Sequence, residues 1–259
     1  MLWPTQLYAH EFLTFTLVLV RISTLVMIAP VFGSREVPAR VRALLAVGLA
    51  VLIVPLEWGK TTAYPETLVN YFLLVGAEAL IGLTLGLGIT VLFSGMQVAG
   101  QIISQMSGMQ LADVFSPGFD TSVPIFSHLL YFVAMAMFVT IGGHRKVMEA
   151  LLDTFVWLPA GRGDFSQSIT EAMTSLLTQS FVLGVRAAAP AMVALLLATL
   201  ILGLVGRTLP QLNVMVLGFG FNVLATLGTL SVSLGAAAWI FQEQLEPALE
   251  TLLEALRHS

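Results

Sequence analysis

Long uncharged runs dominate the chain, and the longest pair lies near its C-terminal end. Residues 187–206 and 214–240 contain no charged side chain, and only the polar stretch RTLPQLN separates them. A helix over the first run is about 30 Å long, which is the thickness of a bilayer hydrocarbon core. A helix over the second run is about 40 Å long, so it must tilt or protrude. The pattern predicts a helical hairpin in or against a membrane.

Four further apolar runs precede the hairpin. They cover residues 12–32, 43–56, 71–93 and 125–141. Residues 147–158 are amphipathic, and residues 171–185 have a helical pattern that we expect to lead directly into the hairpin. The sequence therefore predicts an all-α, multi-pass membrane protein with about six long helices, of which the last two form the hairpin.

The final residues, 241–259, have a separate amphipathic pattern. Glutamates alternate with apolar positions, and the apolar positions share one helical face: Phe241, Leu245, Leu249, Leu252 and Leu256. We expect an acidic amphipathic helix here, after the second arm of the hairpin.

Composition agrees with a membrane protein. The 259 residues are 57% hydrophobic and 10% charged, whereas a soluble domain carries about 25% charged residues. The chain has no strong basic patch, which argues against nucleic-acid binding. It has no cysteine, which excludes disulfides and thiolate metal sites. It also lacks HExxH, GxSxG and P-loop patterns, so we predict no enzymatic activity, no cofactor and no metal.

Positive charge predicts the orientation in the membrane. The stretch GSREVPARVR holds the densest cluster, with Arg35, Arg40 and Arg42 against a single glutamate. The positive-inside rule places this loop in the cytoplasm and the N-terminus outside. The turn at Arg207 is then also cytoplasmic, and the basic GGHRK stretch that follows the fourth apolar run lies outside.

Two charges interrupt the apolar runs, and we expect them to meet. Arg21 is the tenth residue of its run and Glu78 is the eighth of its own. Both runs enter the membrane from the same side in this topology, so their depths differ by only about 3 Å. A charge near mid-membrane costs roughly 2.5–3.5 kcal/mol and needs a partner or water. We interpret the two as a structural intramembrane ion pair; a proton relay or gate is the alternative.

A polar stripe follows the third apolar run. Gln97, Gln101 and Gln105 recur every four residues, and beside them runs a stripe of small residues, Gly100, Ser104 and Gly108. The glutamines line an aqueous path, or they form a helix–helix contact satisfied by amide hydrogen bonds. The sequence leaves both interpretations open.

The turn of the hairpin carries the resemblance to a known family. Arg207, Pro210, Gln211 and Asn213 fall within seven residues. The stretch RTLPQLNV followed by GFGFNV resembles the FliR family of flagellar export-gate proteins. RISTLVMIAPVFGSREVPARVR, EALIGLTLGLG with MQVAGQIISQMSG, and GGHRK match the family in the same order, so the resemblance covers nearly the whole chain. One departure is Val214-Met215, where relatives often have Phe or Ile-Phe.

The resemblance implies an organisation and a set of partners. Residues 1–170 are a FliP-like helical region, 171–242 a FliQ-like hairpin and 243–259 an acidic tail. The chain is expected to assemble with FliP-like and FliQ-like subunits around a central pore in the bacterial inner membrane, at the flagellar basal body. An FlhB-like protein associates with this assembly.

The resemblance also implies a pore plug. In the family, the loop after the third apolar region projects into the pore and helps to close it. The matching positions are about 105–121, where the candidate plug or gate residues are Gln105, Met106, Met109, Phe115 and Phe119.

We therefore expect a non-enzymatic subunit of the flagellar type III protein export gate, through which unfolded flagellar proteins pass. An injectisome export protein of the same architecture is the nearest alternative. A self-contained small-solute transporter that uses Arg21 and Glu78 is an alternative of another class.

Overall fold

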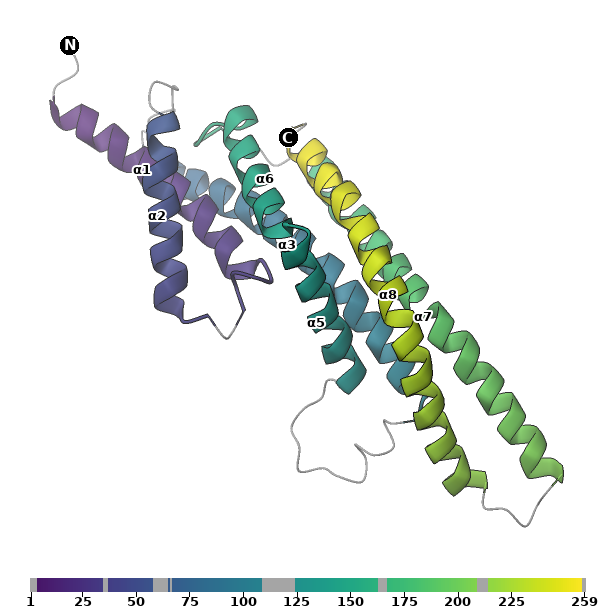
Figure 1. Cartoon of the computed structure of the whole chain (residues 1–259). Coiled ribbons are helices and arrows are strands. Elements are labelled where there is room, and N and C mark those ends of the chain that lie inside the picture. Colours follow the sequence, from purple (N-terminus) through teal and green to yellow (C-terminus); the bar gives the residue numbers. More distant parts are fainter. Residues whose placement is uncertain are drawn as a thin grey trace. The chain divides into compact units, whose positions relative to one another are not determined.

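The described part of the protein consists of helices and connecting turns. The structure is a computed structural model and describes residues 4–34, 37–57, 65, 67–108, 124–162, 167–208 and 214–257. Every regular element in these ranges is an α-helix, which confirms the all-α prediction. The helices are α1 (Pro4–Ile28), α2 (Ala39–Glu57), α3 (Leu68–Met106), α5 (Ile125–Thr140), α6 (Gly143–Trp157), α7 (Gln167–Thr208) and α8 (Val214–Arg257) (Figure 1).

Two helices end at positions different from those that the apolar runs predict, one because of a proline and one because a change of polarity does not end the helix. We expected the first run to extend over residues 12–32, but α1 ends at Ile28, because Pro30 disfavours a helical residue before it. We expected a separate C-terminal helix from residue 241, but α8 runs through this position, from Val214 to Arg257, and its bend lies earlier, between Ser231 and Ser233. Polarity changes near residue 241, but no turn residue interrupts the backbone there, so the helix continues.

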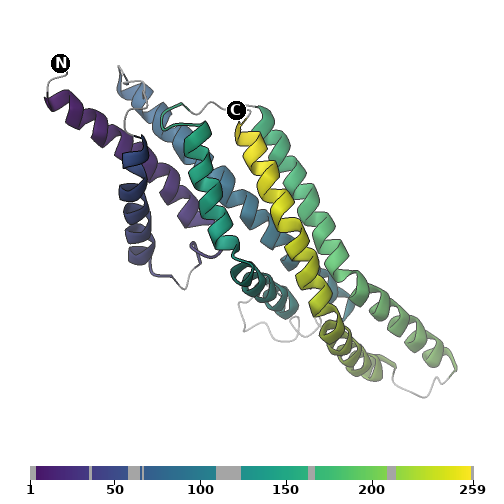
Figure 2. The ribbon, with the colours of Figure 1, turned by 45° about the horizontal axis from the view of Figure 1, so that its top comes forward.

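Long helices replace some of the expected shorter ones. The third apolar run and the glutamine stripe together form the single 39-residue helix α3. The stretch from residue 171 leads directly into the first hairpin arm, as expected, and both belong to the 42-residue helix α7. Figures 1 and 2 both show α7 beside α8, and Leu202 of α7 approaches Gly218 of α8.

Four described helices are long and apolar enough to cross a membrane: Glu11–Ile28, Ala39–Glu57, Leu68–Met106 and Ile169–Thr208. Two bent pairs raise this number to six if each pair is one span. One pair is α5 with α6, bent by 67°, and the other lies within α8, bent by 50°. The basic residues of GGHRK therefore begin α6 at a break between two helices, and do not follow a completed span. Since α2 and α6 begin at the same end of unit 1 (Figure 1), the prediction that GGHRK lies outside, opposite the loop of Arg40 and Arg42, does not agree with the structure.

The helices divide into two compact units made of interleaved segments. Unit 1 contains residues 1–91, 142–177 and 246–259, and unit 2 contains residues 92–141 and 178–245. This division by contacts cuts across the division at residues 170 and 242 that the family resemblance implies, which stays a prediction.

The core of unit 1 brings α1, α3, α6 and the end of α8 together. Leu17, Ile22 and Leu85 are at most 1% exposed. Gly82 and Gly86 of α3 face α1: a Cβ on Gly82 would overlap the carbonyl oxygen of Arg21, and one on Gly86 would lie 3.0 Å from Ile28. Their small-xxx-small spacing thus serves close helix approach, as membrane helices commonly use it.

The end of α8 buries the apolar face that its sequence pattern predicts. Phe241, Leu245, Leu249, Leu252 and Leu256 are at most 6% exposed. Leu252 packs directly over Gly88 of α3, where a Cβ would collide with the leucine. The glutamates at 243, 246, 250 and 254 are exposed, and Glu246 forms an ion pair with Lys146 of α6. The C-terminal segment is therefore an integral part of the fold.

Unit 2 is built around an aromatic cluster and closely approaching helices. The ring of Phe93 lies 5.6 Å from Tyr131, 5.4 Å from Phe138 and 5.2 Å from Phe241, measured between ring centroids. Gly95 packs against the backbone of Ser180, which brings α3 close to α7. Gly100 packs in the same way against the backbone at Ser127, which brings α3 close to α5.

We predict that Gly100→Ala destabilises the protein, because the new Cβ would overlap backbone atoms of Phe126 and Ser127 that cannot rotate away. Overpacking of this kind costs about 1–3 kcal/mol. Thermal unfolding of the detergent-solubilised protein measures the effect. Gly48→Ala is the matched control, since no atom of the described residues lies within 4 Å of its Cβ position and alanine favours a helix. Equal melting temperatures for the two variants would contradict the close α3–α5 contact.

Candidate functional site

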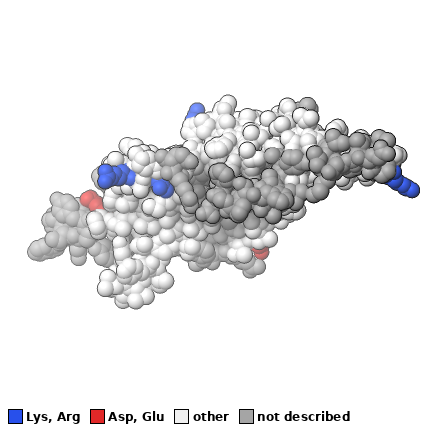
Figure 3. Space-filling model, turned by 90° about the horizontal axis from the view of Figure 1, so that it is seen from below, with Lys and Arg blue, Asp and Glu red and all other residues white. Residues whose placement is uncertain are grey.

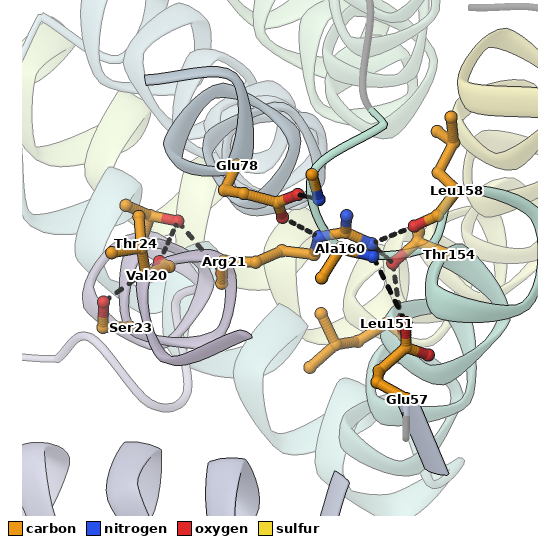
Figure 4. Close-up of polar contacts among 11 residues, drawn as sticks. Val20, Arg21, Ser23, Thr24, Glu57, Glu78, Leu151, Thr154, Leu158 and Ala160 are labelled. Carbon is orange, nitrogen blue, oxygen red and sulfur yellow. Dashed lines mark hydrogen bonds and ion pairs between the residues drawn. The ribbon is translucent and has the colours of Figure 1, made fainter. Parts of the chain in front are cut away.

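Arg21 of α1 and Glu78 of α3 meet inside unit 1. The Nε of Arg21 donates a hydrogen bond to Oε2 of Glu78 at 2.6 Å, and both side chains are completely buried. These are the two charges that we expected to pair from their depth in the sequence. Figure 4 shows the guanidinium reaching from α1 across to the carboxylate of α3.

The other side of the guanidinium contacts α6. Its Nη1 donates to Oγ1 of Thr154 at 3.2 Å and to the carbonyl oxygen of Leu158 at 3.0 Å. The ring of Phe155 lies under the guanidinium carbon at 4.2 Å from its centroid, which is the geometry of a cation–π contact. Only Nη2 has no hydrogen-bond partner in the described part of the chain. One arginine thus joins three helices.

Two buried carboxylates hold the turn that follows α6. Oε1 of Glu78 accepts a hydrogen bond from the backbone N–H of Gly161 at 2.8 Å. Oε2 of Glu57, at the end of α2, accepts one from the N–H of Ala160 at 3.2 Å. Gly161 has a φ of 85°, a conformation that favours glycine. The turn is therefore fixed by side chains from α2 and α3.

This buried network fits a structural role well. A buried ion pair gains little over an apolar substitute, but a single unpaired charge left behind is strongly destabilising. Here the guanidinium and the Glu78 carboxylate each have hydrogen-bond partners beyond one another, which lowers the cost of their burial. The arrangement fixes α1, α3, α6 and the following turn in one register. A proton relay or gate at this pair stays the alternative hypothesis.

Several members of this network were missed in the sequence. In the sequence, Glu57 stands just after the apolar run 43–56 and nothing there indicates burial, whereas it is the last residue of α2 and is 3% exposed. The stretch PAGRG has the composition of an ordinary turn, although its backbone donors at Ala160 and Gly161 satisfy two carboxylates. Thr154 was one polar position of an amphipathic helix. Only the buried arginine, with its several donors, signals that such partners must exist.

The glutamine and small-residue stripes of α3 have opposite environments in unit 2. Gly100 and Ser104 are buried, whereas Gln101 and Gln105 are exposed and Gln97 is half-buried. Gly108, at the end of the stripe, is half-buried and has a φ of 74°. The packed side includes a hydrogen bond from Oγ of Ser127 to the carbonyl oxygen of Gln97 at 2.9 Å. The small residues therefore make the contacts within this chain, and the amides of Gln101 and Gln105 point away from its core.

The plug and turn candidates lie partly outside the described residues. Gln105 and the half-buried Met106 end α3. Met109, Phe115 and Phe119 fall in the range 109–123, which is not described. Arg207 is exposed in the last turn of α7, while Pro210, Gln211 and Asn213 are outside the described residues.

We predict that the effects of substituting Arg21 and Glu78 on the free energy of unfolding are strongly non-additive. Glu78→Gln or Arg21→Met alone leaves one buried charge uncompensated and should cost about 3–5 kcal/mol of stability. The double variant should cost clearly less than the sum of the two single variants, because neither charge is left. Thermal unfolding of the wild type, both single variants and the double variant gives the coupling energy.

The control for this cycle is Glu250→Gln, which removes an exposed carboxylate from α8 and should change stability by less than about 0.5 kcal/mol. Additive effects of Arg21→Met and Glu78→Gln would show that the pair does not contribute as a unit.

Comparison with known proteins gives a family for this fold and site. The family model described as bacterial export proteins, family 1, matches residues 12–248. The match includes Arg21, Glu78, the glutamine stripe and both arms of the hairpin.

Curated relatives cover most of the chain at moderate identity. The flagellar biosynthetic protein FliR of Escherichia coli K12 is 31% identical over 85% of this chain and 81% of its own length. FliR of Bacillus subtilis 168 is 29% identical over 95% of both chains, and FliR of Caulobacter vibrioides is 27% identical over 90% of this chain and 93% of its own. Since the family model matches well over half of the sequence, the chain belongs to the bacterial export proteins, family 1.

Proposed function

We propose that this chain is a structural, non-enzymatic subunit of the flagellar type III protein export gate. The family match over residues 12–248 carries the proposal. The relatives compared above all bear the name flagellar biosynthetic protein FliR, which favours the flagellar system over an injectisome export protein of the same architecture. The gate lies in the bacterial inner membrane at the flagellar basal body, and unfolded flagellar proteins pass through its pore.

Large uncovered apolar faces support a role within an assembly. Only 22% of the membrane-length windows of α2 and α7 is buried within the chain. On α7 the uncovered positions include Leu197, Leu200 and Leu204, which are 53–65% exposed. Contiguous apolar surface of this kind must be covered by lipid or by other protein. FliP-like and FliQ-like subunits, with an associated FlhB-like protein, are the proposed neighbours.

The exposed glutamines support a place for α3 at the pore wall. Gln101 and Gln105 form an uncharged polar face on an otherwise apolar helix, and buried small residues beside them hold that helix against α5. Amides hydrogen-bond water and passing peptide groups without a strong charge preference. Such a wall suits clients of unrelated sequence. The residues that follow, including Met106, Met109, Phe115 and Phe119, are the proposed plug.

In this proposal the buried Arg21–Glu78 pair has a structural role. Both side chains are fully buried and are used by hydrogen bonds to neighbouring backbone and side chains. We propose that the pair holds α1, α3 and α6 in position. The small-solute transporter, which would use the same pair as a binding or relay site, would require these groups to become accessible to solute.

Mild-detergent purification of the tagged chain from native membranes tests the proposal. We expect FliP-like and FliQ-like proteins to stay bound in fixed ratios and to be identified by mass spectrometry. Injectisome proteins in their place would assign the chain to that system. A well-behaved monomer or homodimer that transports solute when reconstituted alone would overturn the export-gate assignment.

Cysteine labelling tests the place of the glutamines, and the absence of native cysteine makes single-cysteine variants clean. We expect Gln101→Cys to react with a charged, membrane-impermeant thiol reagent at least about tenfold faster than Leu200→Cys, because the reactive thiolate requires water. Both positions are exposed in the chain, but Leu200 lies on an apolar face. Equally slow labelling of both would favour the alternative, in which the glutamines form a contact with a neighbouring helix.

A further inference from the structure

An apolar groove lies between α2 and α6 in unit 1. Its volume is about 210 Å³, and its walls are four aliphatic side chains of α2 and three of α6, among them Leu49, Leu56 and Met148. Leu52 and Leu152 on its rim are 71% and 42% exposed, so the groove is open along one side. Among the described residues, no charged or hydroxyl side chain lines it.

Basic side chains lie on the same helical stripes at one end of the groove. Arg42 precedes Leu49 by seven residues, which puts it two turns away on the same face of α2. On α6, His144 and Arg145 precede Met148 by four and three residues, about one turn away. Figures 1 and 2 both show α2 and α6 rising from the same end of unit 1, so these cationic positions share that end. We call Arg42 and Arg145, together with the imidazole of His144 beside them, the cationic foot.

Two side chains of the cationic foot have unused hydrogen-bond donors or acceptors, and the third is exposed. Arg42 and His144 are half-buried, and the Nε of Arg42 and the Nδ1 of His144 are buried atoms without a hydrogen-bond partner among the described residues. Arg145 approaches Glu149 at 3.8 Å, with both side chains more than 60% exposed. Exposed pairs of this kind contribute little and exchange readily. Figure 3, which shows the protein from below, has a few small blue patches of Lys and Arg among mostly white residues where the surface is described.

The groove lacks the residues that a helix contact favours. Helix contacts in membranes favour small and hydrogen-bonding residues, whereas leucine, isoleucine and methionine line this groove. From Arg42 to Leu52 a helix rises about 15 Å, half of a hydrocarbon core. These dimensions suit one acyl chain of a single leaflet.

We infer that the α2–α6 groove binds one acyl chain of an anionic glycerophospholipid, whose phosphate sits at Arg42, His144 and Arg145. Aliphatic walls bind the chain without selectivity, and the cationic foot selects the negative head group. This bound lipid would cover part of the uncovered face of α2. The inference concerns the surface of this chain alone and does not depend on its role in export.

Photo-crosslinking with a defined lipid tests the inference. The full-length protein is purified in detergent and incubated with phosphatidylglycerol that carries a diazirine in one acyl chain. We expect crosslinked peptides concentrated at residues 49–56 and 148–152, and displacement by unlabelled phosphatidylglycerol but not by phosphatidylcholine. Since each cation near an anionic lipid contributes roughly a fivefold change in affinity, Arg42→Gln with Arg145→Gln should weaken binding about 25-fold.

Two further variants test separately whether binding depends on the basic side chains near the groove and on the open space within it. Arg186→Gln removes an exposed arginine of α7 that belongs to unit 2, and it should leave lipid binding to the unit 1 groove unchanged. Leu52→Trp fills the rim at a position that is already exposed, so it should block crosslinking in the groove while the cationic foot stays intact.

Three results would overturn the inference. Equal crosslinking of phosphatidylcholine and phosphatidylglycerol would show that the cationic foot selects nothing. Crosslinks spread evenly over α2 and the apolar face of α7 would indicate ordinary surrounding lipid. In the complex isolated from native membranes, a partner protein crosslinked to residues 49–56 through a cysteine-directed linker on Leu52→Cys would show that the groove is a subunit contact.

Discussion

A full positive charge inside an apolar bundle is the constraint around which unit 1 is arranged. Arg21 is completely buried, so its donors must be satisfied by the protein, and the structure supplies Glu78, Thr154 and the carbonyl of Leu158. These acceptors come from α3 and α6, which must therefore stand at fixed positions around α1. The network extends beyond the ion pair, because Glu78 also accepts a hydrogen bond from the backbone N–H of Gly161. One unfavourable burial thus determines the mutual placement of three helices and a turn.

The other helix surfaces are of two kinds: some are closely packed within the chain, and some are apolar and uncovered. Where helices meet within the chain, glycines allow backbone approach, as at Gly82 against Arg21 and Gly100 against Ser127. Elsewhere α2 and α7 display leucine and valine that nothing in the described chain covers. A monomer with such faces is stable only in lipid or among other subunits. The chain is therefore built with strong internal contacts and with large surfaces left for its surroundings.

Hydrophobic periodicity predicts much of this architecture, but it does not predict the network. Helix positions, the hairpin and the buried face of Leu245, Leu249 and Leu252 follow from composition and spacing. Arg21 and Glu78 could be matched by depth because charges in apolar runs are rare. Glu57 and the N–H groups of Ala160 and Gly161 could not, because their role depends on where the chain returns in space after α6. Continuity of α8 was missed because a change of polarity was taken for a boundary.

The order of segments in unit 1 also determines when it can be completed. Its core includes Leu252 and Leu256, which pack with α3 although more than 160 residues of chain separate Gly88 from Leu252. During synthesis the chain is made from the N-terminus, so the position over Gly88 that Leu252 occupies cannot be filled until the last turns of α8 have been made. Contacts of such long range form late and slowly. Unit 1 can therefore close only after synthesis has passed these turns of α8, and a chain cut short before residue 246 would lack this contact.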